Sequence, residues 1–499
     1  MRDIVSVRLM RDSDIATING GVSGVELMYR AAMGVYNSVT WREKIAIVCG
    51  DGNNAGDGYA LALILKDNGY DPHIITLGSK LSPDGEYYLN LCKNREISTL
   101  PLGKCDLSAY EIIVDCIFGT GFRSVPTGIY ADAINKINSS DAYVVSVDIN
   151  SGLNGDNGLA TLAVKSDLTV SVGTLKSGLV LGMARDYAKR VVNCNIGIEI
   201  IDTPYHLIEE NDVKSVLKAR KSFSNKGDYG YVALIGGCME YSGAIKLANL
   251  ALSSLKTGAG VVKLATARSI YPSVSPYLVE STFYPLKDRK GSIVFSKKEI
   301  DGLLRGVRAV AIGMGIGNSK NVHKILVHIL KNYDITVIID ADGLNSLAKY
   351  GIDILKETKC NVILTPHPKE MERLSGVKVT DIISDPINIA KRFASEYSLT
   401  LLLKGSATVV TDGKDVYISD RGCSGMATAG SGDVLSGIIL GVCAQNNIKE
   451  ETLLNVASAA FINGMAGEIA QMKSNEISMT ALDTVNFLGE AISKINESN

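Results

Sequence analysis

Residues 45–58 read IAIVCGDGNNAGDG, and residues 59–66, YALALILK, continue with a helical pattern. The apolar run 45–49 predicts a buried strand, and the polar, glycine-rich turn after it lies where a helix N-terminus can bind an anion. An ordinary strand-to-helix turn needs one glycine and one capping residue, whereas this one holds four glycines, two asparagines and two aspartates. The spacing is not GxGxxG, so it does not support plain nicotinamide-dependent redox chemistry. We therefore expect a small-ligand site at this turn.

The same alternation of Val/Ile-rich runs and helical patterns continues along the chain, and it is typical of parallel sheets flanked by helices. The fold class is therefore α/β. We expect two α/β domains, 1–212 and 213–499, with the polar stretch 201–225 as their linker. The expected strands are 45–49, 73–77, 112–116, 143–147, 168–172 and 194–199, then 231–235, 261–265, 309–313, 336–339, 361–364, 400–403 and 408–411.

The composition of the chain argues against several classes of binding partner. The chain has 51 Lys+Arg and 53 Asp+Glu, a formal charge of −2, so we expect no nucleic-acid and no anionic-membrane partner. No apolar run approaches the length of about 18 residues that spans a bilayer, and the first residues interleave charges, so we expect a cytoplasmic protein. The nine cysteines form no CxxC pair and the five histidines no ligand pattern, which favours free thiols over a zinc site.

Two further strands of the first domain run into polar loops, and each has an aspartate at its carboxyl end: Asp115 for one and Asp148 for the other. Ligands bind at the carboxyl edge of open α/β sheets, so both aspartates and the glycine turn can converge on one site. Taken singly, each aspartate is explained as well by a cap or turn. The Asn, Asp and Ser oxygens of these loops could also hold a hard cation.

In the second domain the most informative stretch is GCSGMATAGSGD, residues 422–433, followed by an apolar helix. Its glycines suit phosphate binding, and Asp433 could accept a proton or simply cap the helix. Lys404 lies at a strand end and His367 lies between two prolines, and both positions suit phosphate binding. Alternatively, Lys404 is an ordinary surface lysine and His367 only caps a helix. Asp342 and Asn345 follow another strand, where capping is an equal explanation. No Walker A sequence, GxSxG elbow or HExxH helix is present.

Together these motifs resemble one family. GDGNNAGDGYALA, DCIFGTGF and SVDINSG resemble the epimerase half of the bifunctional NAD(P)H-hydrate repair enzymes; NKGDYGYVALIGG, IDADGLN, LTPHPKEMERL, LKGSAT and GMATAGSGD resemble the dehydratase half. The resemblance implies a Rossmann-like three-layer epimerase domain followed by a ribokinase-like dehydratase domain. It also implies the substrates NADH hydrate, NADPH hydrate and ADP. A homo-oligomer is expected as well.

The resemblance further implies residue roles in the epimerase. Asp148 is the acid/base candidate and also contacts the hydrate. The implied potassium ligands are Asn54, Asp115 and Ser151. The implied substrate loops are Asn53, Asn54, Ala55, Gly56 and Asp57, then Gly119, Thr120, Gly121, Phe122, Arg123, Ser124 and Val125.

For the dehydratase, the resemblance implies phosphorylation of the hydrate's hydroxyl by ADP with Asp433 as base, Mg²⁺ accompanying the nucleotide, and then loss of phosphate. The hydrate is expected at Gly317, His367, Pro368, Lys369, Glu370, Met371, Glu372, Arg373 and Asp433. The nucleotide is expected at Lys404, Gly405, Ser406, Ala407 and Thr408, and at Cys423, Ser424, Gly425, Met426, Ala427, Thr428, Ala429, Gly430, Ser431 and Gly432.

Three positions depart from the family pattern: Ala55 replaces a common Gly, and Asp51 and Asn150 each replace a common Pro. Ala55 fits only if its φ is negative. Two other functions stay open at this point. One is a ribokinase-like small-molecule kinase, which needs the same glycine loop and aspartate. The other is a non-catalytic binding module in place of the epimerase.

Overall fold

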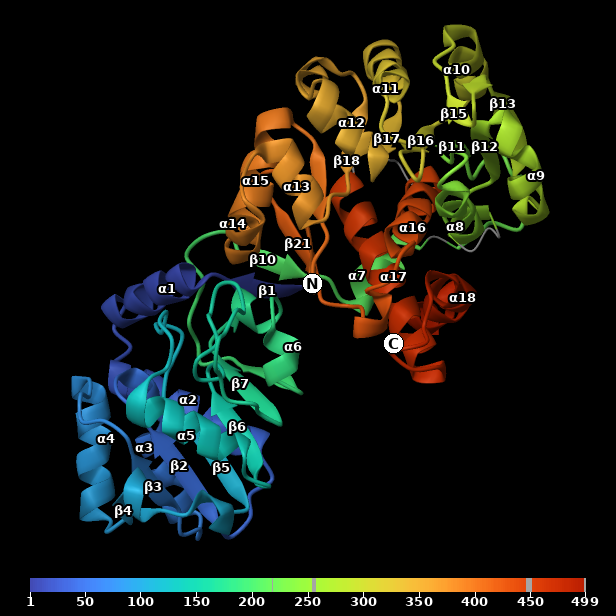
Figure 1. The fold of residues 1–499 in the computed structure, drawn as a ribbon. Coiled ribbons are helices and arrows are strands. Elements are labelled where there is room, and N and C mark those ends of the chain that lie inside the picture. Colours follow the sequence, from blue (N-terminus) through green and yellow to red (C-terminus); the bar gives the residue numbers. More distant parts are fainter. Residues whose placement is uncertain (218, 254–256, 446–450, 498–499) are drawn as a thin grey trace. The chain divides into compact units, whose positions relative to one another are not determined.

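The computed structural model describes residues 1–217, 219–253, 257–445 and 451–497 (Figure 1). It divides into two compact units. The N-terminal unit is Asp3–Tyr205, and the C-terminal unit is Met1–Arg2 together with His206–Asn499. This division lies a few residues before the expected 212/213 position.

The N-terminal unit is built on a seven-stranded sheet with the order β4-β3-β2-β5-β6-β7-β9. All of its neighbouring strands are parallel. The short strands β1 and β8 pair in parallel with each other, Ile4 opposite Leu175. The strands are β1 (Arg2–Val5), β2 (Ile45–Cys49), β3 (His73–Thr76), β4 (Thr99–Pro101), β5 (Ile112–Cys116), β6 (Tyr143–Val147), β7 (Leu168–Val172), β8 (Leu175–Lys176) and β9 (Val191–Cys194).

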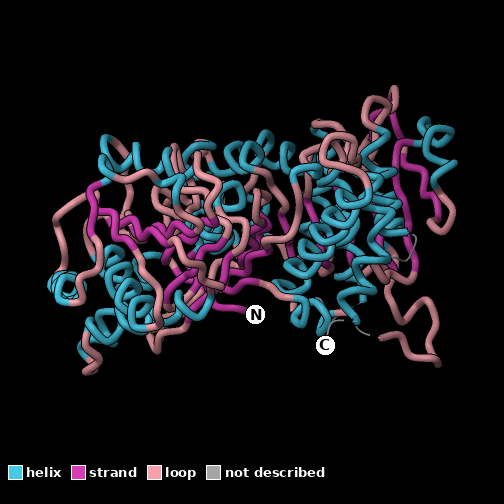
Figure 2. Tube along the Cα trace, turned by 90° about the horizontal axis from the view of Figure 1, so that it is seen from below, coloured by secondary structure: helices cyan, strands magenta, loops and turns pink. Residues whose placement is uncertain are grey.

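Helices cover both faces of this sheet. Ile45, Ile47 and Cys49 pack into one core with α2, α3 and α4, whereas Ala46 and Val48 pack into a second core with α5. Alternate residues of one strand are thus buried on opposite faces, which gives the expected three layers (Figure 2). The helices are α1 (Val7–Asn19), α2 (Gly24–Ser38), α3 (Asn53–Asp67), α4 (Pro83–Asn94), α5 (Gly128–Asn138) and α6 (Ala184–Tyr187).

The C-terminal unit has the strand order β13-β12-β11-β16-β17-β18-β19-β20-β21-β10. Strands from β13 to β19 are parallel, β20 is antiparallel to both neighbours, and β10 is parallel to β21. A separate antiparallel pair joins β14 to β15. The strands are β10 (Tyr205–Leu207), β11 (Tyr231–Ile235), β12 (Val261–Ala267), β13 (Thr282–Leu286), β14 (Asp288–Arg289), β15 (Ser292–Ile293), β16 (Ala309–Ile312), β17 (Thr336–Ile339), β18 (Asn361–Leu364), β19 (Thr400–Leu403), β20 (Thr408–Thr411) and β21 (Val416–Ser419).

Helices α8 and α16 pack on the parallel strands, and α17 packs on β19, β20 and β21. Helix α17 is long and apolar enough to span a membrane by composition, but 83% of its apolar window is buried within the protein, as in a core helix. The helices are α7 (Glu210–Val216), α8 (Ser242–Ser253), α9 (Tyr271–Val274), α10 (Lys297–Leu304), α11 (Lys320–Asn332), α12 (Asp342–Tyr350), α13 (Pro368–Ser375), α14 (Val379–Ser384), α15 (Pro386–Tyr397), α16 (Ser431–Gln445), α17 (Thr452–Lys473) and α18 (Ala481–Glu497).

Among the consecutive parallel strands of each sheet, the strand order reverses between β2 and β5 and between β11 and β16. Loops that leave neighbouring strands at such a point diverge to opposite sides, which opens a place for a ligand at the carboxyl edge. The polar loops found in the sequence follow these strands and their neighbours, so the topology brings them together.

One strand prediction is wrong, and the predicted linker is incomplete, although the two units divide between Tyr205 and His206, inside 201–225. The strand expected at 194–199 is β9, Val191–Cys194, so it lies earlier than predicted because it must align with β7. The stretch 201–225 is not a plain linker, since it contains β10 and α7, in which Val213 and Val216 are buried. Only two side chains of α7 are buried, so its pattern of apolar residues is too short to predict a helix from the sequence.

Candidate active sites

In the N-terminal unit, Asp115 at the end of β5 ties together the loops after β5 and β6. It is fully buried and accepts hydrogen bonds from the Ser151 hydroxyl at 2.5 Å, the Ser151 amide at 2.9 Å and the Ser146 hydroxyl at 2.8 Å. Burial raises the pKa of Asp115, and the hydrogen bonds from Ser151 and Ser146 oppose that rise. Asp115 therefore fixes Ser151 in position.

Asn54 joins the same cluster from the first turn of α3. Its amide nitrogen donates to the Phe118 carbonyl at 2.9 Å, and Ser151 Oγ lies 3.3 Å from that carbonyl oxygen. The Asn54 Oδ1 atom is buried, and among the described residues it has no hydrogen-bond partner. An unsatisfied buried oxygen beside other oxygens is what a hard cation such as potassium requires, so these residues fit the implied ion.

Asp148 follows β6 and has a positive φ of 68°. Its Oδ1 pairs with the ammonium of Lys176 in β8, a lysine whose side chain is only 2% exposed. A Cβ placed on Gly119 would lie 3.8 Å from Asp148 Oδ2 and 3.5 Å from Asn54 Cβ. The structure thus brings Asn54, Gly119 and Asp148 together, as the strand-end argument predicts.

Two more carboxyl groups lie near this pair. Burial and then the charge of Asp148 raise the pKa of Asp57 well above its ordinary value. Burial also raises the pKa of Asp14, whereas Lys176 lowers it. A buried lysine facing several carboxyl groups is a typical mark of a functional site.

The implied substrate loops occupy two segments. Residues 53–57 form the first turns of α3, and Ala55 does not have a positive φ, so its replacement of glycine is compatible with the loop. Residues 119–125 lie between β5 and α5; in this loop Phe122 stacks on Phe118 and Arg123 pairs with Asp156 at 2.9 Å. Val125 is 53% exposed.

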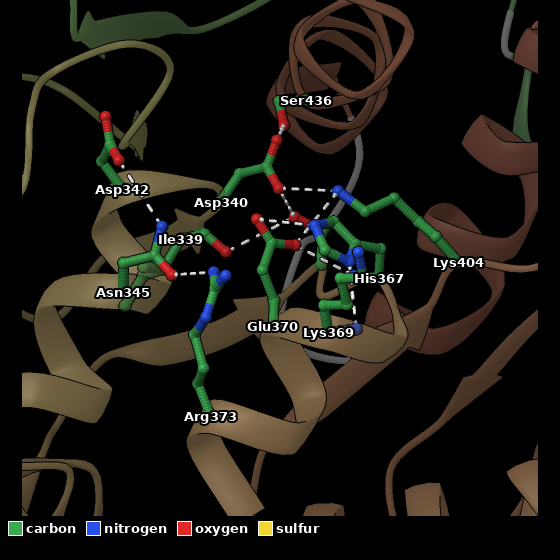
Figure 3. A network of polar contacts seen from close by, with 11 residues as sticks. Ile339, Asp340, Asp342, Asn345, His367, Lys369, Glu370, Arg373, Lys404 and Ser436 are labelled. Atoms are coloured by element: carbon green, nitrogen blue, oxygen red, sulfur yellow. Dashed lines mark hydrogen bonds and ion pairs between the residues drawn. The ribbon is translucent and has the colours of Figure 1, made fainter. Parts of the chain in front are cut away.

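In the C-terminal unit the central residue is Asp340, which follows β17 and is 1% exposed (Figure 3). Its Oδ1 accepts from Lys404 Nζ at 2.9 Å and from the Thr365 hydroxyl at 2.8 Å. Its Oδ2 accepts from the Ser436 hydroxyl of α16 at 2.8 Å. One carboxylate therefore links the ends of β17, β18 and β19 to α16.

Lys404 also lies 3.9 Å from Glu370. Burial lowers the pKa of Lys404, but Asp340 and Glu370 outweigh it and leave the pKa raised. Gly432 lies alongside, because a Cβ there would be 3.3 Å from Lys404 Nζ. A side chain at position 432 would press on the lysine.

Asp433 is in the first turn of α16. Burial is the main cause that raises its pKa to about 7; Asp340 adds to the rise and Lys404 opposes it. A carboxyl group with this pKa is poised to accept a proton near neutral pH. The charges of three carboxyl groups, Asp340, Glu370 and Asp433, thus act on one lysine.

Residues 367–373 form the beginning of α13. His367 is the N-cap of this helix, which was the alternative to phosphate handling for this residue. His367 Nδ1 accepts from the Lys369 amide at 3.1 Å, and Glu370 Oε2 accepts from the His367 amide at 2.9 Å. Arg373 donates to Asn345 at 2.7 Å. Arg373 and Asn345 line a 460 Å³ cavity together with Asn318, Ala348 and Lys349. Beside it, the Gly317 amide donates to Asp342 Oδ2 at 2.9 Å.

The expected nucleotide residues lie in two loops of the same unit. Residues 404–408 connect β19 to β20, and residues 423–432 lead into α16. The amide of Gly425 is already used, since it donates to Gln471 of α17 at 2.9 Å. Gly430 has a φ of 96°, which suits glycine and lets the loop turn into the helix.

Comparison with known proteins then decides the family. The family model described as NAD(P)H-hydrate dehydratase matches residues 232–488, and the one described as YjeF-related protein N-terminus matches residues 24–178. The chain is 34% identical over 470 residues to the bifunctional NAD(P)H-hydrate repair enzyme Nnr of Dictyoglomus turgidum, covering 91% of this chain and 89% of that protein. The chain belongs to the bifunctional NAD(P)H-hydrate repair enzyme family.

Solved structures agree with this NAD(P)H-hydrate repair family. An ADP/ATP-dependent NAD(P)H-hydrate dehydratase from Bacillus subtilis, co-crystallised with ATP/Mg²⁺, superposes with a TM-score of 0.51 at 28% identity, covering 59% of this chain and 100% of that one. A ribokinase-like protein from Enterococcus faecalis superposes with a TM-score of 0.50 at 22% identity, covering 59% of this chain and 97% of that one. The expected fold classes are thereby confirmed.

Sequence reasoning missed several residues of these clusters. Lys176 was not singled out, although a lysine inside an apolar run is itself a signal of a buried partner. Asp340 and Thr365 lie within the strand-end motifs of the sequence but receive no role from it, and Ser436 lies outside these motifs, because their role appears only when three strand ends and a helix are placed together. Asp14 comes from the first helix, far from every motif.

Proposed function

We propose that this protein repairs hydrated NADH and NADPH. The N-terminal unit, taken as residues 1–212, interconverts the R and S hydrates; the C-terminal unit, residues 213–499, uses ADP to dehydrate the S hydrate, releasing NAD(P)H, AMP and phosphate. One observation carries the proposal: Asp433, with a pKa raised to about 7, stands beside Lys404 at the start of α16. That is the base-and-cation pair that hydroxyl phosphorylation needs.

Dehydration proceeds in two steps. Asp433 takes the proton of the hydrate's hydroxyl, whose oxygen attacks the β-phosphorus of ADP, so that AMP leaves. The ring nitrogen then expels the phosphate from the carbon, and loss of a proton from the adjacent carbon restores the dihydronicotinamide. Phosphorylation matters because it converts a poor leaving group into a good one.

The remaining residues bind and orient the substrates. Residues 404–408 and 423–432 hold the nucleotide, with Lys404 facing its phosphates, while Gly317, residues 367–373 and Asp433 hold the hydrate. Mg²⁺ would accompany the nucleotide and neutralise the charge of its phosphates; among the described residues no group of three or more His, Cys, Asp or Glu side chains forms a site for the ion by itself.

Epimerisation is assigned to Asp148, which acts as acid and base while the bond at the carbon next to the ring nitrogen breaks and re-forms. Residues 53–57 and 119–125 hold the hydrate. Asn54, Asp115 and Ser151 would hold potassium, which supplies fixed positive charge beside the substrate. The partnerless Asn54 Oδ1 supports this ion site.

The proposal also includes a cytoplasmic protein that acts on small molecules as a homo-oligomer. Light scattering on the purified protein measures the oligomeric state directly.

The test is to incubate the protein with mixed epimers of NADH hydrate and potassium, with ADP, ATP or no nucleotide, and to follow the dihydronicotinamide absorbance. Full recovery with ADP is expected. Recovery that stalls at the share of one epimer would reduce the N-terminal unit to a binding module. Accumulation of a stable phosphorylated product would instead show a kinase.

A further inference from the structure

The buried ion pair between Lys176 and Asp148 goes beyond the residues assigned so far. Lys176 lies on β8, opposite Val5 of β1, and only 2% of its side chain is exposed. Its ammonium donates to Asp148 Oδ1 and to the Val172 carbonyl, and it lies 3.5 Å from the Ser171 hydroxyl. Burying a lysine is costly, so its position must be fixed by these partners.

The ion pair with Lys176 gives the two carboxylate oxygens of Asp148 different surroundings. Oδ1 faces Lys176 and lies 3.4 Å from the Val172 amide, which can donate to it. Oδ2 lies toward Gly119, because a Cβ added there would be 3.8 Å from it, and the hydrogen bonds that described residues donate to the Asp148 carboxylate go to Oδ1. One oxygen is thus anchored, while the other is presented to the implied substrate loops.

The backbone alone does not hold this arrangement. Asp148 has a φ of 68°, in the left-handed region that side chains other than glycine adopt at a cost. Asn, Asp and His tolerate this region better than other residues, and an ion pair to a fixed lysine adds the restraint that the single residue lacks.

We propose that Lys176 is a positioning residue for epimerisation: it anchors Asp148 Oδ1 so that Oδ2 faces the hydrate. This inference rests on the proposed epimerase function. It assigns to Lys176 no contact with the substrate. Its loss should therefore lower kcat and leave KM nearly unchanged.

The experiment compares Lys176→Met and Lys176→Arg with the native protein on the R hydrate, with the epimers separated by chromatography. We expect kcat for epimerisation to fall at least about 100-fold in Lys176→Met with KM within about threefold, and Lys176→Arg to regain at least about tenfold of that loss. Dehydration of the S hydrate by the same molecules should not change, so it reports on sample quality. Where Lys176→Met does not fold, Lys176→Gln keeps a hydrogen-bond donor without the charge and should lose kcat in the same way.

A matched control is Lys189→Met, because Lys189 makes a 2.7 Å pair with Asp167 in the same unit but is 79% exposed. It should keep native epimerase kinetics. The inference is overturned if Lys176→Met keeps more than about a tenth of native kcat, if only KM changes, or if arginine rescues nothing. If the native protein itself does not epimerise the hydrate, the proposed function fails, which is a distinguishable result.

Discussion

Each unit pairs a lysine with an aspartate at the carboxyl edge of its sheet: the buried Lys176 with Asp148 in the N-terminal unit, and the partly exposed Lys404 with Asp340 in the C-terminal unit. In the first, the paired aspartate is itself the acid/base candidate. In the second, the paired aspartate is occupied by three donors, and the proposed base is a different residue, Asp433. The difference shows two ways to set up a carboxyl group: anchoring it with a lysine, or burying it beside other carboxylates until its pKa approaches 7.

The largest expected effect comes from removing the C-terminal lysine. Lys404 opposes the raised pKa of Asp433, so Lys404→Met should raise that pKa above 7 and move the acid limb of the dehydratase pH profile upward. At pH 7 we expect kcat/KM to fall at least about 100-fold, because the change also removes the cation that the proposed function places against the phosphates. Lys356→Met, which removes an exposed 3.1 Å pair with Glu396, is the control and should leave the profile in place. If the acid limb of the pH profile does not shift, Lys404 does not influence the pKa of Asp433, which would contradict the account.

The second prediction concerns stability and its sign. The pKa of Asp433 is about 7 in the folded protein against an ordinary 3.8, so the folded state holds the proton more tightly and stability falls as pH rises between these values. Asp433→Asn removes that cost and should raise the free energy of unfolding of the C-terminal unit at pH 7.5 by about 2 kcal/mol. Denaturant titration measures it. At pH 3 the gain should vanish, and a gain that is equal at both pH values would contradict the account.

The third change tests the close approach of the glycine loop to Lys404. Gly432→Ala places a Cβ 3.3 Å from Lys404 Nζ, which is held by Asp340, and should lower dehydratase kcat/KM about tenfold. Gly489→Ala in α18, where an added Cβ meets nothing within 4 Å, is the matched control and should leave the activity unchanged. Equal activity in both variants would mean that Lys404 moves freely.

The smallest effect concerns backbone strain beside Asp340. Ala341 has φ 46° and ψ −114°, a conformation that favours glycine, whereas the positive-φ residue at the corresponding strand end of the other unit is an aspartate. Ala341→Gly should stabilise the C-terminal unit by about 1 kcal/mol in denaturant titration. Ala348→Gly, inside α12, the helix that follows Ala341, should destabilise the C-terminal unit by about 1 kcal/mol. Destabilisation by both changes would show that Ala341 is unstrained.

The central parallel strands could be predicted from the sequence because they are buried on both faces and read as continuous apolar runs. Ile45–Cys49, Ile112–Cys116 and Thr336–Ile339 have the predicted bounds. Edge strands such as β4 and β13 lack that signal, since part of each is exposed. The short strands β1 and β8 carry too few residues for any period to appear.

The sites were predictable to the extent that chemistry lies in local motifs. Asp148, Asp433 and the glycine turns stand out in the sequence, because their loops hold more glycine and polar residues than an ordinary turn requires. Lys176 and Asp340 do not, because each depends on partners brought from other strands by the fold. The roles of these two residues depend on burial and on contacts between distant segments, and the spacing of residues in the sequence shows neither.

The central claim is that two separate sites, one built on Asp148 and one on Asp433, carry the two halves of the repair. The most direct measurement mixes two variants, Asp148→Asn and Asp433→Asn, with both hydrate epimers, potassium and ADP, and compares the mixture with each variant alone. Asp148→Asn alone should stall at the share of the S hydrate, Asp433→Asn alone should recover no NADH, and the mixture should recover all of it at a rate well above spontaneous epimerisation. A mixture that stalls where Asp148→Asn stalls would contradict the account.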